Sequence, residues 1–518
     1  MNCSESKSII TGNQKDCQMK NSIAAALLIT VLSASHIFSQ NCANTSVGFT
    51  PISDLGSSSF RGYTGGLYPG GSNSRPYGHE QAGSEIAKQI VPLDVNGNYD
   101  PVNGKIVLLS IGMSNCNQEF GVFMSQVSAS SNVNPKLKLV NGAQGGYHIN
   151  LIIDSNNVYW ANVLSLLSNA GVTSKQVQAV WYKNVDASPA DTSFPGYSNG
   201  LRAKHKTVLN ILKNKFANLR QCFIASRIYA GYATTGLSPE PNSYYSGWAV
   251  KWVVEDQISG DTSLAYKGPG KRSPWISWGP YLWADGTVPR SDGLTWICPT
   301  DYNTDGTHPS VNGRTKVANL LMTFFMNDAA TKPWFRRNLT IHLTAAPEGF
   351  LNIAGNTLSM RDTVKVYLRR IFPPFHTVDS CTGILDSASL TANLNFYNLT
   401  NGTYYLQVIH RNSIETWSRS GGEIMTIGGI IDYDMTSSGG MAYGNNLILK
   451  GTKHCIYSGD VNRDGIIDAS DLSTADNDAS AFAAGYLQSD VNGDMTADAA
   501  DLAIIDNNAF NNIQSVDP

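Results

Sequence analysis

The sequence predicts an α/β domain with a parallel sheet, followed by a small β-sandwich and a C-terminal module that contains an internal repeat. Strand-like runs alternate with helical patterns through residues 41–335, which is typical of a parallel sheet with helices on both faces. Strand-like alternation without a clear helix fills residues 336–455, and similar acidic segments recur in residues 456–518. The length of 518 residues agrees with several domains of ~150 residues each.

The clearest elements are recognised by the spacing of their apolar residues. Residues 105–111 (KIVLLSI), 137–140 and 178–182 are short apolar runs that favour buried strands. Residues 201–218 and 311–325 carry apolar side chains every three or four positions, which favours amphipathic helices. Farther along, two segments alternate as strands between turns rich in Gly, Asn and Ser, namely 363–368 (TVKVYL) and 403–410 (TYYLQVIH).

Residues 1–40 are interpreted as an export signal. Met19 and Lys20 precede the apolar run 23–31 (IAAALLITV), which is too short to span a bilayer. The polar residues 1–18 leave both Met1 and Met19 open as starts, and a buried N-terminal helix is the alternative. No other run reaches the ~18 apolar residues of a membrane span, so we expect a secreted or cell-surface attached protein. Disulfides are then permitted, but the sequence does not select a pairing.

Charge is distributed unevenly along the chain. The net charge is −3, but residues 459–518 hold 12 Asp and one basic residue, Arg463, so this tail carries −11 and the remainder +8. The concentration of carboxylates favours cation binding at the C-terminus. The positive remainder is scattered and forms no basic stripe, which argues against nucleic-acid binding. A charged share of 15% and 47 Gly also exclude a coiled coil, a collagen and a disordered acidic chain.

The segment IGMSNCNQEF begins where the predicted strand 105–111 ends. Gly112 permits a tight turn, and Ser114 falls at the start of the next helix. The carboxyl edge of a parallel sheet and a helix N-terminus both suit a nucleophile. A serine is also a common helix N-cap, so this position alone does not establish a nucleophile.

A histidine with a carboxylate partner follows in the segment DYNTDGTHPSVNG. Asp305 and His308 are three residues apart, directly before a predicted amphipathic helix. This spacing allows the carboxylate to hold one ring nitrogen while the other faces a serine. The alternative is a turn-capping Asp305 and a surface His308.

Two further loops end predicted strands at the same edge of the sheet. The segment NGAQGG follows the second strand, and Asn184 follows the third. The backbone N–H groups of Ser114 and Gly146, and the Asn184 amide, are therefore candidate donors to an oxyanion. Gly145 competes with Gly146 for this role.

In chain order, Gly-x-Ser-Asn, Gly, Asn and Asp-x-x-His-Pro resemble the four blocks of the SGNH or GDSL-like serine hydrolases, over roughly residues 100–325. The resemblance implies a flavodoxin-like parallel sheet and an esterase that needs no cofactor for catalysis. It implies Ser114 as nucleophile, with Asp305 and His308 as its partners. It also implies Gly146 and Asn184 as oxyanion donors.

The leading hypothesis is a secreted serine esterase that deacetylates carbohydrate or hydrolyses a small ester, where the carbohydrate is implied by the family resemblance. The alternative is a non-catalytic cell-surface or adhesion protein that retains the hydrolase fold. Three departures from the family pattern favour the alternative: Met113 replaces an Asp, and Lys183 and Val185 flank Asn184. A sulfatase or phosphatase is not favoured, because the predicted catalytic region contains no cluster of metal ligands in its sequence.

Aromatic residues gather in the segment SPWISWGPYLWADG, at Trp275, Trp278 and Trp283. They either stack on sugar rings at a cleft or pack the long connections of the domain. Residues 336–455 offer no comparable constellation, so a spacer and a carbohydrate-binding role both stay open for this region.

The C-terminal repeat pairs DVNRDGIIDASDL with DVNGDMTADAADL. A twelve-residue calcium loop uses oxygens at positions 1, 3, 5, 7, 9 and 12, and both copies supply them. So many carboxylates repel one another without a cation, and we therefore expect calcium to order this module. The turn at position 6 is Gly465 in the first copy but Met495 in the second. The predicted ligands are Asp460, Asn462, Asp464, the Ile466 carbonyl, Asp468 and Asp471 in the first copy, and Asp490, Asn492, Asp494, the Thr496 carbonyl, Asp498 and Asp501 in the second.

This repeat resembles the type I dockerin domain over about residues 455–518. The resemblance implies an EF-hand-like helical module with two structural calcium ions. It further implies attachment to a cohesin-bearing scaffold or cell-surface protein. A solvated acidic tail is the alternative. The long repeat period and Met495 depart from the family, so calcium binding is a more direct expectation than cohesin recognition.

Overall fold

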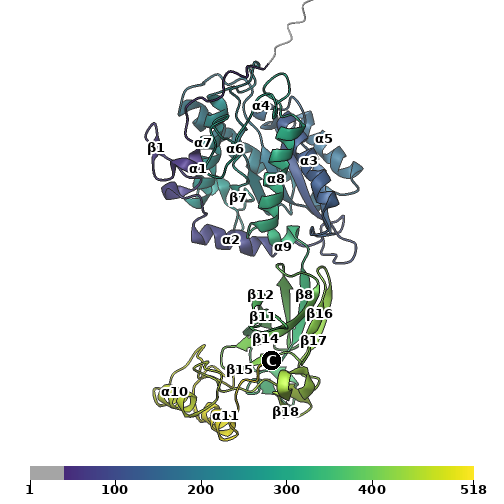
Figure 1. The fold of residues 1–518 in the computed structure, drawn as a ribbon, viewed down its shortest axis with the longest axis vertical. Helices are drawn as coiled ribbons and strands as arrows, with labels where there is room; N and C mark the ends of the chain where they lie inside the picture. The colour runs from purple at the N-terminus through teal and green to yellow at the C-terminus, as the bar shows by residue number, and fades with distance from the viewer. Residues whose placement is uncertain (1–39) are drawn as a thin grey trace, which may run out of the picture. The chain divides into compact units, whose positions relative to one another are not determined.

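The structure is a computed structural model that describes residues 40–518 (Figure 1). The predicted export signal, residues 1–40, lies outside the described residues except for Gln40. Across the described range, none of the helices combines the length and the apolar character that a membrane crossing requires.

A sheet of five parallel strands forms the centre of the α/β domain, in the order β4-β3-β5-β6-β7. The second strand lies outside the first and the later strands extend the other edge, which is the flavodoxin-like order. The predicted parallel sheet is confirmed. Every residue of β3 and β5 is buried, as expected for strands covered on both faces. The strands are β3 (Ile106–Gly112), β4 (Leu137–Asn141), β5 (Val177–Lys183), β6 (Gln221–Ile224) and β7 (Trp275–Trp278).

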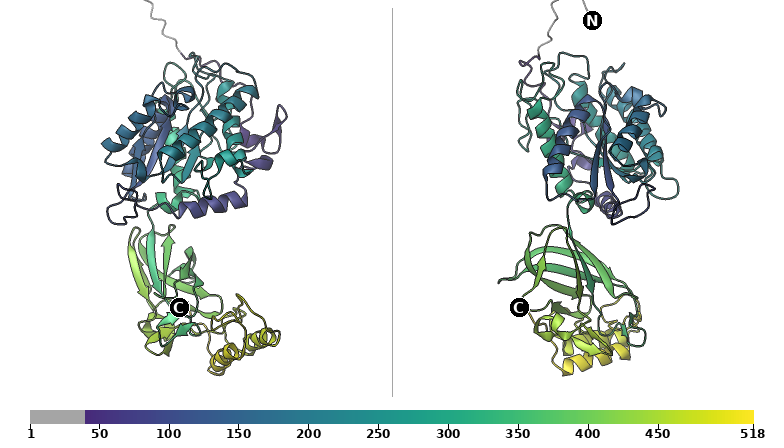
Figure 2. Two further views of the ribbon diagram at one scale, coloured as in Figure 1. Left: turned by 180° about the vertical axis from the view of Figure 1, so that it is seen from behind. Right: turned by 90° about the vertical axis from the view of Figure 1, so that its right-hand side faces the viewer.

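Helices cover both faces of this sheet (Figure 2). Helix α3 packs against α8, and α6 packs against α7. The helices predicted at 201–218 and 311–325 are confirmed as α6 and α8, whereas α7 is buried almost all round and shows no amphipathic period. The elements are α1 (Ile52–Leu55), β1 (Ser59–Phe60), β2 (Tyr63–Thr64), α2 (Tyr77–Ala87), α3 (Ser114–Ala129), α4 (Ile149–Ile152), α5 (Val158–Asn169), α6 (Gly196–Lys215), α7 (Asn242–Ile258), α8 (Val311–Asn327) and α9 (Lys332–Phe335).

A disulfide joins Cys42 to Cys298. It ties the start of the described chain to the segment that leads into the predicted histidine loop. The sequence left the pairing open, because the two cysteines are far apart in the chain. The other described cysteines are free: Cys116, Cys222, Cys381 and Cys455.

The next part of the chain forms two sheets around a second hydrophobic core. One sheet has the order β12-β11-β14-β15, with β16 also paired to β14, and the other has the order β13-β8-β17. Both sheets contribute fully buried side chains to this core, for example Ile341 and Val366, as in a small β-sandwich. The strands predicted at 363–368 and 403–410 are confirmed as β11 and β14. The strands are β8 (Leu339–Thr344), β9 (Leu351–Asn352), β10 (Thr357–Leu358), β11 (Asp362–Arg370), β12 (Thr377–Leu385), β13 (Thr391–Phe396), β14 (Gly402–His410), β15 (Ser413–Trp417), β16 (Glu423–Met425), β17 (Ile430–Asp434), β18 (Ile448–Lys450) and β19 (Lys453–Cys455).

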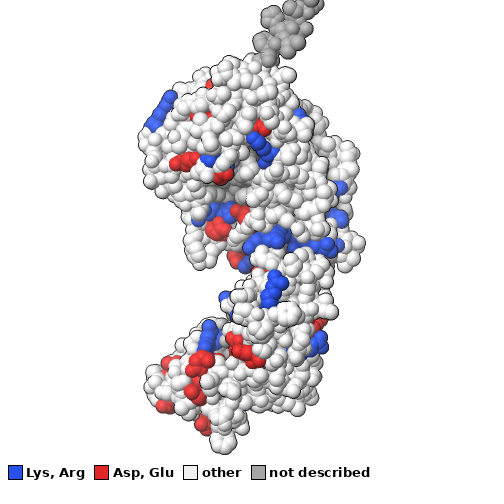
Figure 3. All heavy atoms as spheres, viewed as in Figure 1, with Lys and Arg blue, Asp and Glu red and all other residues white. Residues whose placement is uncertain are grey.

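Two helices of 12 residues, α10 (Ala469–Ser480) and α11 (Ala499–Phe510), each follow one copy of the C-terminal repeat. Val461, Val491 and Ile505 from this part belong to the same hydrophobic cluster as the β-sandwich residues. Residues 336–455 and 456–518 therefore share one core. On the face seen in Figure 3, acidic side chains gather over the C-terminal part, whereas the α/β domain shows both signs of charge.

Candidate active site

The junction between β3 and α3 positions Ser114. Strand β3 ends at Gly112, Met113 is extended with a φ of −107°, and α3 begins at Ser114. A Cβ atom on Gly112 would lie 2.2 Å from the Lys183 carbonyl oxygen and 2.6 Å from the Cys116 Cβ. Only glycine allows the backbones to approach this closely. The turn thus leaves the Ser114 side chain partly exposed at the carboxyl edge of the sheet.

The structure brings Ser114, His308 and Asp305 into one hydrogen-bonded row. The His308 Nε2 atom lies 2.8 Å from Ser114 Oγ, and its Nδ1 atom lies 2.6 Å from Asp305 Oδ2. The other carboxylate oxygen of Asp305 accepts the backbone N–H groups of Thr307 and His308, at 2.9 and 3.0 Å. Asn115 anchors the loop by donating its side-chain N–H to the Thr307 carbonyl oxygen. The loop conformation therefore aims Asp305 Oδ2 at the ring.

The protonation of Asp305 determines which nitrogen of His308 carries the hydrogen. Burial raises the pKa of Asp305, but hydrogen bonds from His308 and Thr307 outweigh it, so the pKa is lowered overall. An ionised Asp305 accepts the hydrogen on Nδ1 and leaves a lone pair on Nε2 facing Ser114 Oγ. This is the tautomer that a general base for a serine requires.

The loops after β4 and β5, which carry the two predicted oxyanion donors, are bound to the Ser114 turn and to each other. Gln144 N–H donates to the Gly112 carbonyl oxygen at 3.0 Å, and Ile149 N–H donates to the Val185 carbonyl oxygen at 3.0 Å. Gly146 has a φ of +82°, a conformation that favours glycine.

The side chain of Asn184 is buried and partly engaged. Its Nδ2 donates to the Tyr147 carbonyl oxygen at 3.0 Å, and its Oδ1 accepts the Val185 N–H at 2.8 Å. Within residues 40–518, neither Asn184 nor Gly146 forms a hydrogen bond with Ser114 or His308. One N–H of the Asn184 amide remains for another acceptor, because an amide nitrogen carries two.

Lys183 forms a buried ion pair that the sequence analysis did not anticipate. Its Nζ lies 2.7 Å from both carboxylate oxygens of Glu119 on α3, and both side chains are almost completely buried. Burial raises the pKa of Glu119 and lowers that of Lys183. The cation beside Asn184 is thus matched by Glu119. The one feature of the sequence that points to this ion pair is Glu119 itself, a single carboxylate on the apolar face of α3 that also carries Cys116 and Phe120.

The tryptophan-rich segment mostly packs the interior. Trp275 and Trp283 are fully buried, and Trp278 is 2% exposed. The packing interpretation of these residues therefore holds for the first two, whereas the edge of Trp278 borders a cavity described below.

The two copies of the C-terminal repeat adopt the same local structure. Asp471 Oδ1 accepts the N–H groups of Val461 and Asn462 at 2.8 and 3.0 Å. Asp501 Oδ1 accepts the corresponding N–H groups in the second copy at the same distances. The Asp at position 9 of each copy caps the following helix: Asp468 and Asp498. The sequence repeat is therefore also a structural repeat.

The first carboxylate differs between the copies. Asp460 Oδ1 is buried without a hydrogen-bond partner, and burial together with Asp471 raises the pKa of Asp460 to about 6. Asp490 Oδ2 instead lies 3.1 Å from the Arg411 guanidinium of the β-sandwich. An orphaned carboxylate oxygen fits a cation in the first copy. In the described part of the chain no three Asp, Glu, His or Cys side chains converge as a metal cluster, so amide and carbonyl oxygens such as those of Asn462 and Ile466 would complete the site.

Positions 4 and 6 of both loops are left-handed, and the glycine stands at a different one in each copy. The first copy has Arg463 (φ +63°) and Gly465 (φ +84°), and the second has Gly493 (φ +75°) and Met495 (φ +71°). A non-glycine residue in this conformation costs ~1–2 kcal/mol.

We predict that Met495→Gly stabilises the protein by about 0.5–1 kcal/mol, because the strain at Met495 exceeds the entropic cost of a new glycine. Thermal unfolding with calcium present measures the effect. The matched change Gly465→Met in the first copy should destabilise by a similar amount. A lower stability of Met495→Gly would contradict the strain assignment.

Comparisons with known proteins add little to this geometry. No protein-family model matches the sequence, and no curated protein matches it. Among solved structures, a carbohydrate esterase family 3 protein from Talaromyces cellulolyticus is similar at 14% identity, over 42% of this chain and 94% of that chain, with a TM-score of 0.23. An extracellular lipase from Streptomyces rimosus matches at 13% identity, over 42% and 99%, with a TM-score of 0.23.

A type II cohesin–X–dockerin complex of Acetivibrio cellulolyticus, an interface mutant, matches at 11% identity, over 33% of this chain and 94% of that chain, with a TM-score of 0.20. All three TM-scores are far below 0.5, so the likenesses do not define a function. The function is therefore inferred from the side-chain geometry of this chain.

Proposed function

We propose that this protein is a secreted serine esterase. The observation that carries the proposal is the row Asp305–His308–Ser114, with both ring nitrogens of His308 at hydrogen-bond distance from their partners. The Cys42–Cys298 disulfide supports an oxidising, extracellular compartment. The alternative of a non-catalytic surface protein loses one of its supports, because Glu119 matches the charge of Lys183.

The proposed mechanism transfers the acyl group in two steps. His308 Nε2 takes the proton of Ser114 as its Oγ attacks the ester carbonyl carbon, and Asp305 stabilises the imidazolium. The N-terminus of α3, the Gly146 N–H and the free N–H of Asn184 are the proposed donors to the oxyanion. His308 then protonates the departing alcohol, and a water molecule releases the acid by the same route.

The proposed substrate is an acylated carbohydrate or a small ester with a short acyl group. The side chains of His308 and Asp305 are 21% and 32% exposed, so the row is open to solvent and accessible to a bulky alcohol part. A long acyl chain would need a deep apolar cavity. The carbohydrate itself follows from the sequence resemblance to esterases joined to a dockerin-like module.

A panel of esters tests this proposal. We expect hydrolysis of 4-nitrophenyl acetate and of acetylated xylan, with kcat/KM falling by at least tenfold from acetate to octanoate. Feruloyl esters serve as a further arm of the panel. Preference for octanoate would contradict the short acyl group, and no turnover of any ester would favour the non-catalytic alternative.

We further propose that the repeat binds two structural calcium ions through the twelve residues predicted above, and that it docks to a cohesin-bearing protein. The groove between α10 and α11 has a volume of about 590 Å³ and is built from equivalent positions of the two copies. Leu472 and Leu502 supply its apolar floor, and Asp476 and Asp506 lie along it. An apolar floor with carboxylates fits a protein partner that offers apolar and basic side chains.

Calorimetry on the chelator-treated protein should show two calcium ions per chain. We expect tighter binding in the first copy, because Asp460 Oδ1 has no other partner whereas Asp490 already contacts Arg411. Asp460→Ala should remove the tighter site and Asp490→Ala the weaker one. Absence of calcium uptake, with thermal unfolding unchanged by chelator, would refute the calcium site.

A further inference from the structure

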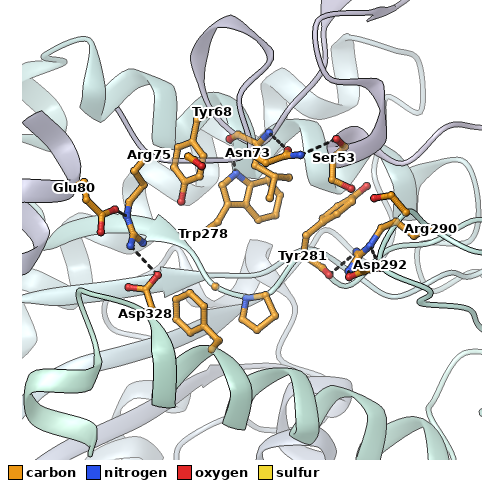
Figure 4. Close-up of a pocket in the computed structure, with 16 residues that line it drawn as sticks. Ser53, Tyr68, Asn73, Arg75, Glu80, Trp278, Tyr281, Arg290, Asp292 and Asp328 are labelled. Atoms are coloured by element: carbon orange, nitrogen blue, oxygen red, sulfur yellow. Dashed lines mark hydrogen bonds and ion pairs between the residues drawn. The ribbon is translucent and has the colours of Figure 1, made fainter. Parts of the chain in front are cut away.

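A cavity of about 670 Å³ lies beside the edge strand β7 (Figure 4). Strand β7 is three strands from β3 in the sheet, and none of Ser114, Asp305 and His308 lines the cavity. Helix α8 begins close to His308, and Asp328, just past its other end, lines the cavity. A helix of 17 residues is roughly 25 Å long, so this part of the cavity is remote from the proposed catalytic row.

The middle of the cavity is apolar and rigid. Trp278, Tyr281, Phe324 and Pro280 border it, and the first two are held by hydrogen bonds (Figure 4). The Trp278 Nε1–H donates to the Leu67 carbonyl oxygen at 2.8 Å, and the Tyr281 hydroxyl oxygen accepts the N–H of Ile52 at 3.2 Å. Trp278 and Tyr281 are only 2% and 4% exposed, so each contributes a small part of its ring to the cavity wall. Their positions are fixed before a ligand binds, which lowers the entropic cost of binding.

Planar polar side chains flank this apolar centre on two sides, as Figure 4 shows. On one side Arg75 pairs with Glu80 and, at 2.7 Å, with Asp328. On the other side Arg290 pairs with Asp292 at 2.6 Å. Arg75 Nη1 also donates to Ser277 Oγ, and Arg290 Nη1 donates to the Tyr281 and Trp283 carbonyl oxygens. A guanidinium carries five N–H donors and a carboxylate about four acceptor sites, so a few N–H groups and several carboxylate lone pairs remain for a ligand.

The charges of the lining select the kind of ligand. The lining contains two arginines and three carboxylates, and each arginine forms ion pairs with one or two of these carboxylates. The cavity therefore offers no excess positive charge to an anion. A neutral sugar chain matches the combination, since its hydroxyls both donate and accept while its C–H faces pack on aromatic surfaces. The volume lies within the ~300–1,000 Å³ of small-molecule sites.

We propose that this cavity is a second, non-catalytic site that binds a segment of a neutral polysaccharide. Binding there does not depend on the proposed esterase activity. The benefit of this binding for catalysis does rest on the proposed esterase function. A polysaccharide held beside β7 would keep its ester groups near Ser114 while the enzyme acts.

Isothermal calorimetry of full-length Ser114→Ala protein with xylohexaose, cellohexaose and mannohexaose tests the proposal, because this variant can bind without turnover. Ser74 lines the cavity, is exposed, and its hydroxyl forms no hydrogen bond within residues 40–518. Adding Ser74→Trp should fill the space without disturbing the fold. Ser57→Trp, at an exposed serine outside the cavity, is the matched control. Asn73→Ala is a second probe, read together with thermal unfolding, because the lining amide of Asn73 also accepts the Leu67 N–H and donates to the Ser53 carbonyl oxygen.

We expect millimolar or tighter binding of at least one hexaose, weakened at least tenfold by Ser74→Trp and at least threefold by Asn73→Ala, and unchanged by Ser57→Trp. In the protein with an intact Ser114, Ser74→Trp should leave hydrolysis of 4-nitrophenyl acetate unchanged and slow that of acetylated xylan. No binding of any hexaose, or binding insensitive to Ser74→Trp, would overturn the proposed site even if the esterase is active. Tighter binding of an oligogalacturonate than of neutral sugars would overturn the ligand class.

Discussion

Ser114→Ala should lower kcat/KM for an acetyl ester by at least about 10⁴-fold while the protein stays folded. The substitution removes the nucleophile and, with it, the 2.8 Å hydrogen bond to His308. The side chain is partly exposed and begins a helix, so little packing is lost. Steady-state kinetics with 4-nitrophenyl acetate, together with thermal unfolding, measures both quantities.

The matched control is Ser130→Ala, a half-buried serine just past the far end of the same helix, and it should change kcat/KM less than twofold. Asp305→Asn should lower kcat/KM by about 10³–10⁴-fold, which lies between the effects of Ser130→Ala and Ser114→Ala. The reason is that the amide cannot stabilise the imidazolium or fix the tautomer of His308. Turnover of Ser114→Ala within tenfold of the unmodified protein would refute Ser114 as the nucleophile.

Lys183→Met should destabilise the α/β domain by about 3–5 kcal/mol, because it leaves the Glu119 carboxylate buried without its partner. Both groups are almost completely buried, so water cannot replace the lost interaction. Denaturant-induced unfolding of the full chain measures the change in the free energy of unfolding.

The double variant Glu119→Leu/Lys183→Met should recover most of this loss, since it removes both charges at once. The exposed pair Lys88–Glu85 provides the control, with side chains 64% and 66% exposed, and Lys88→Met should cost less than ~1 kcal/mol. A loss in Lys183→Met no larger than in Lys88→Met would show that Glu119 does not depend on its partner.

Elements formed by residues that are close together in the sequence could be predicted from local sequence patterns. The run 105–111 is a continuous apolar strand followed by glycine, so both β3 and the position of Ser114 at the start of α3 follow from the sequence. Asp305 and His308 are close in sequence, and their contact needs only one turn of chain. The order of strands then brings their loop to the same edge as Ser114.

Features that depend on distant contacts could not be predicted in this way. Glu119 and Lys183 are 64 residues apart, and nothing in either segment marks the other as its partner. Helix α7 is buried almost all round, so its sequence has no amphipathic period. Strand β7 has only four residues and lies in a Trp-rich segment that also suits a loop. The cavity beside β7 is lined by residues from several separate segments, so no single sequence pattern predicts it.

Reaction with a fluorophosphonate probe tests the central claim most directly, because only an activated serine attacks the phosphorus centre rapidly. Intact-mass spectrometry followed by peptide mapping identifies the modified residue. We predict one adduct per chain, on Ser114, and none on Ser114→Ala or on a His308→Ala protein. No adduct, or an adduct on another residue at the same rate in Ser114→Ala, would contradict a catalytic Ser114–His308–Asp305 row.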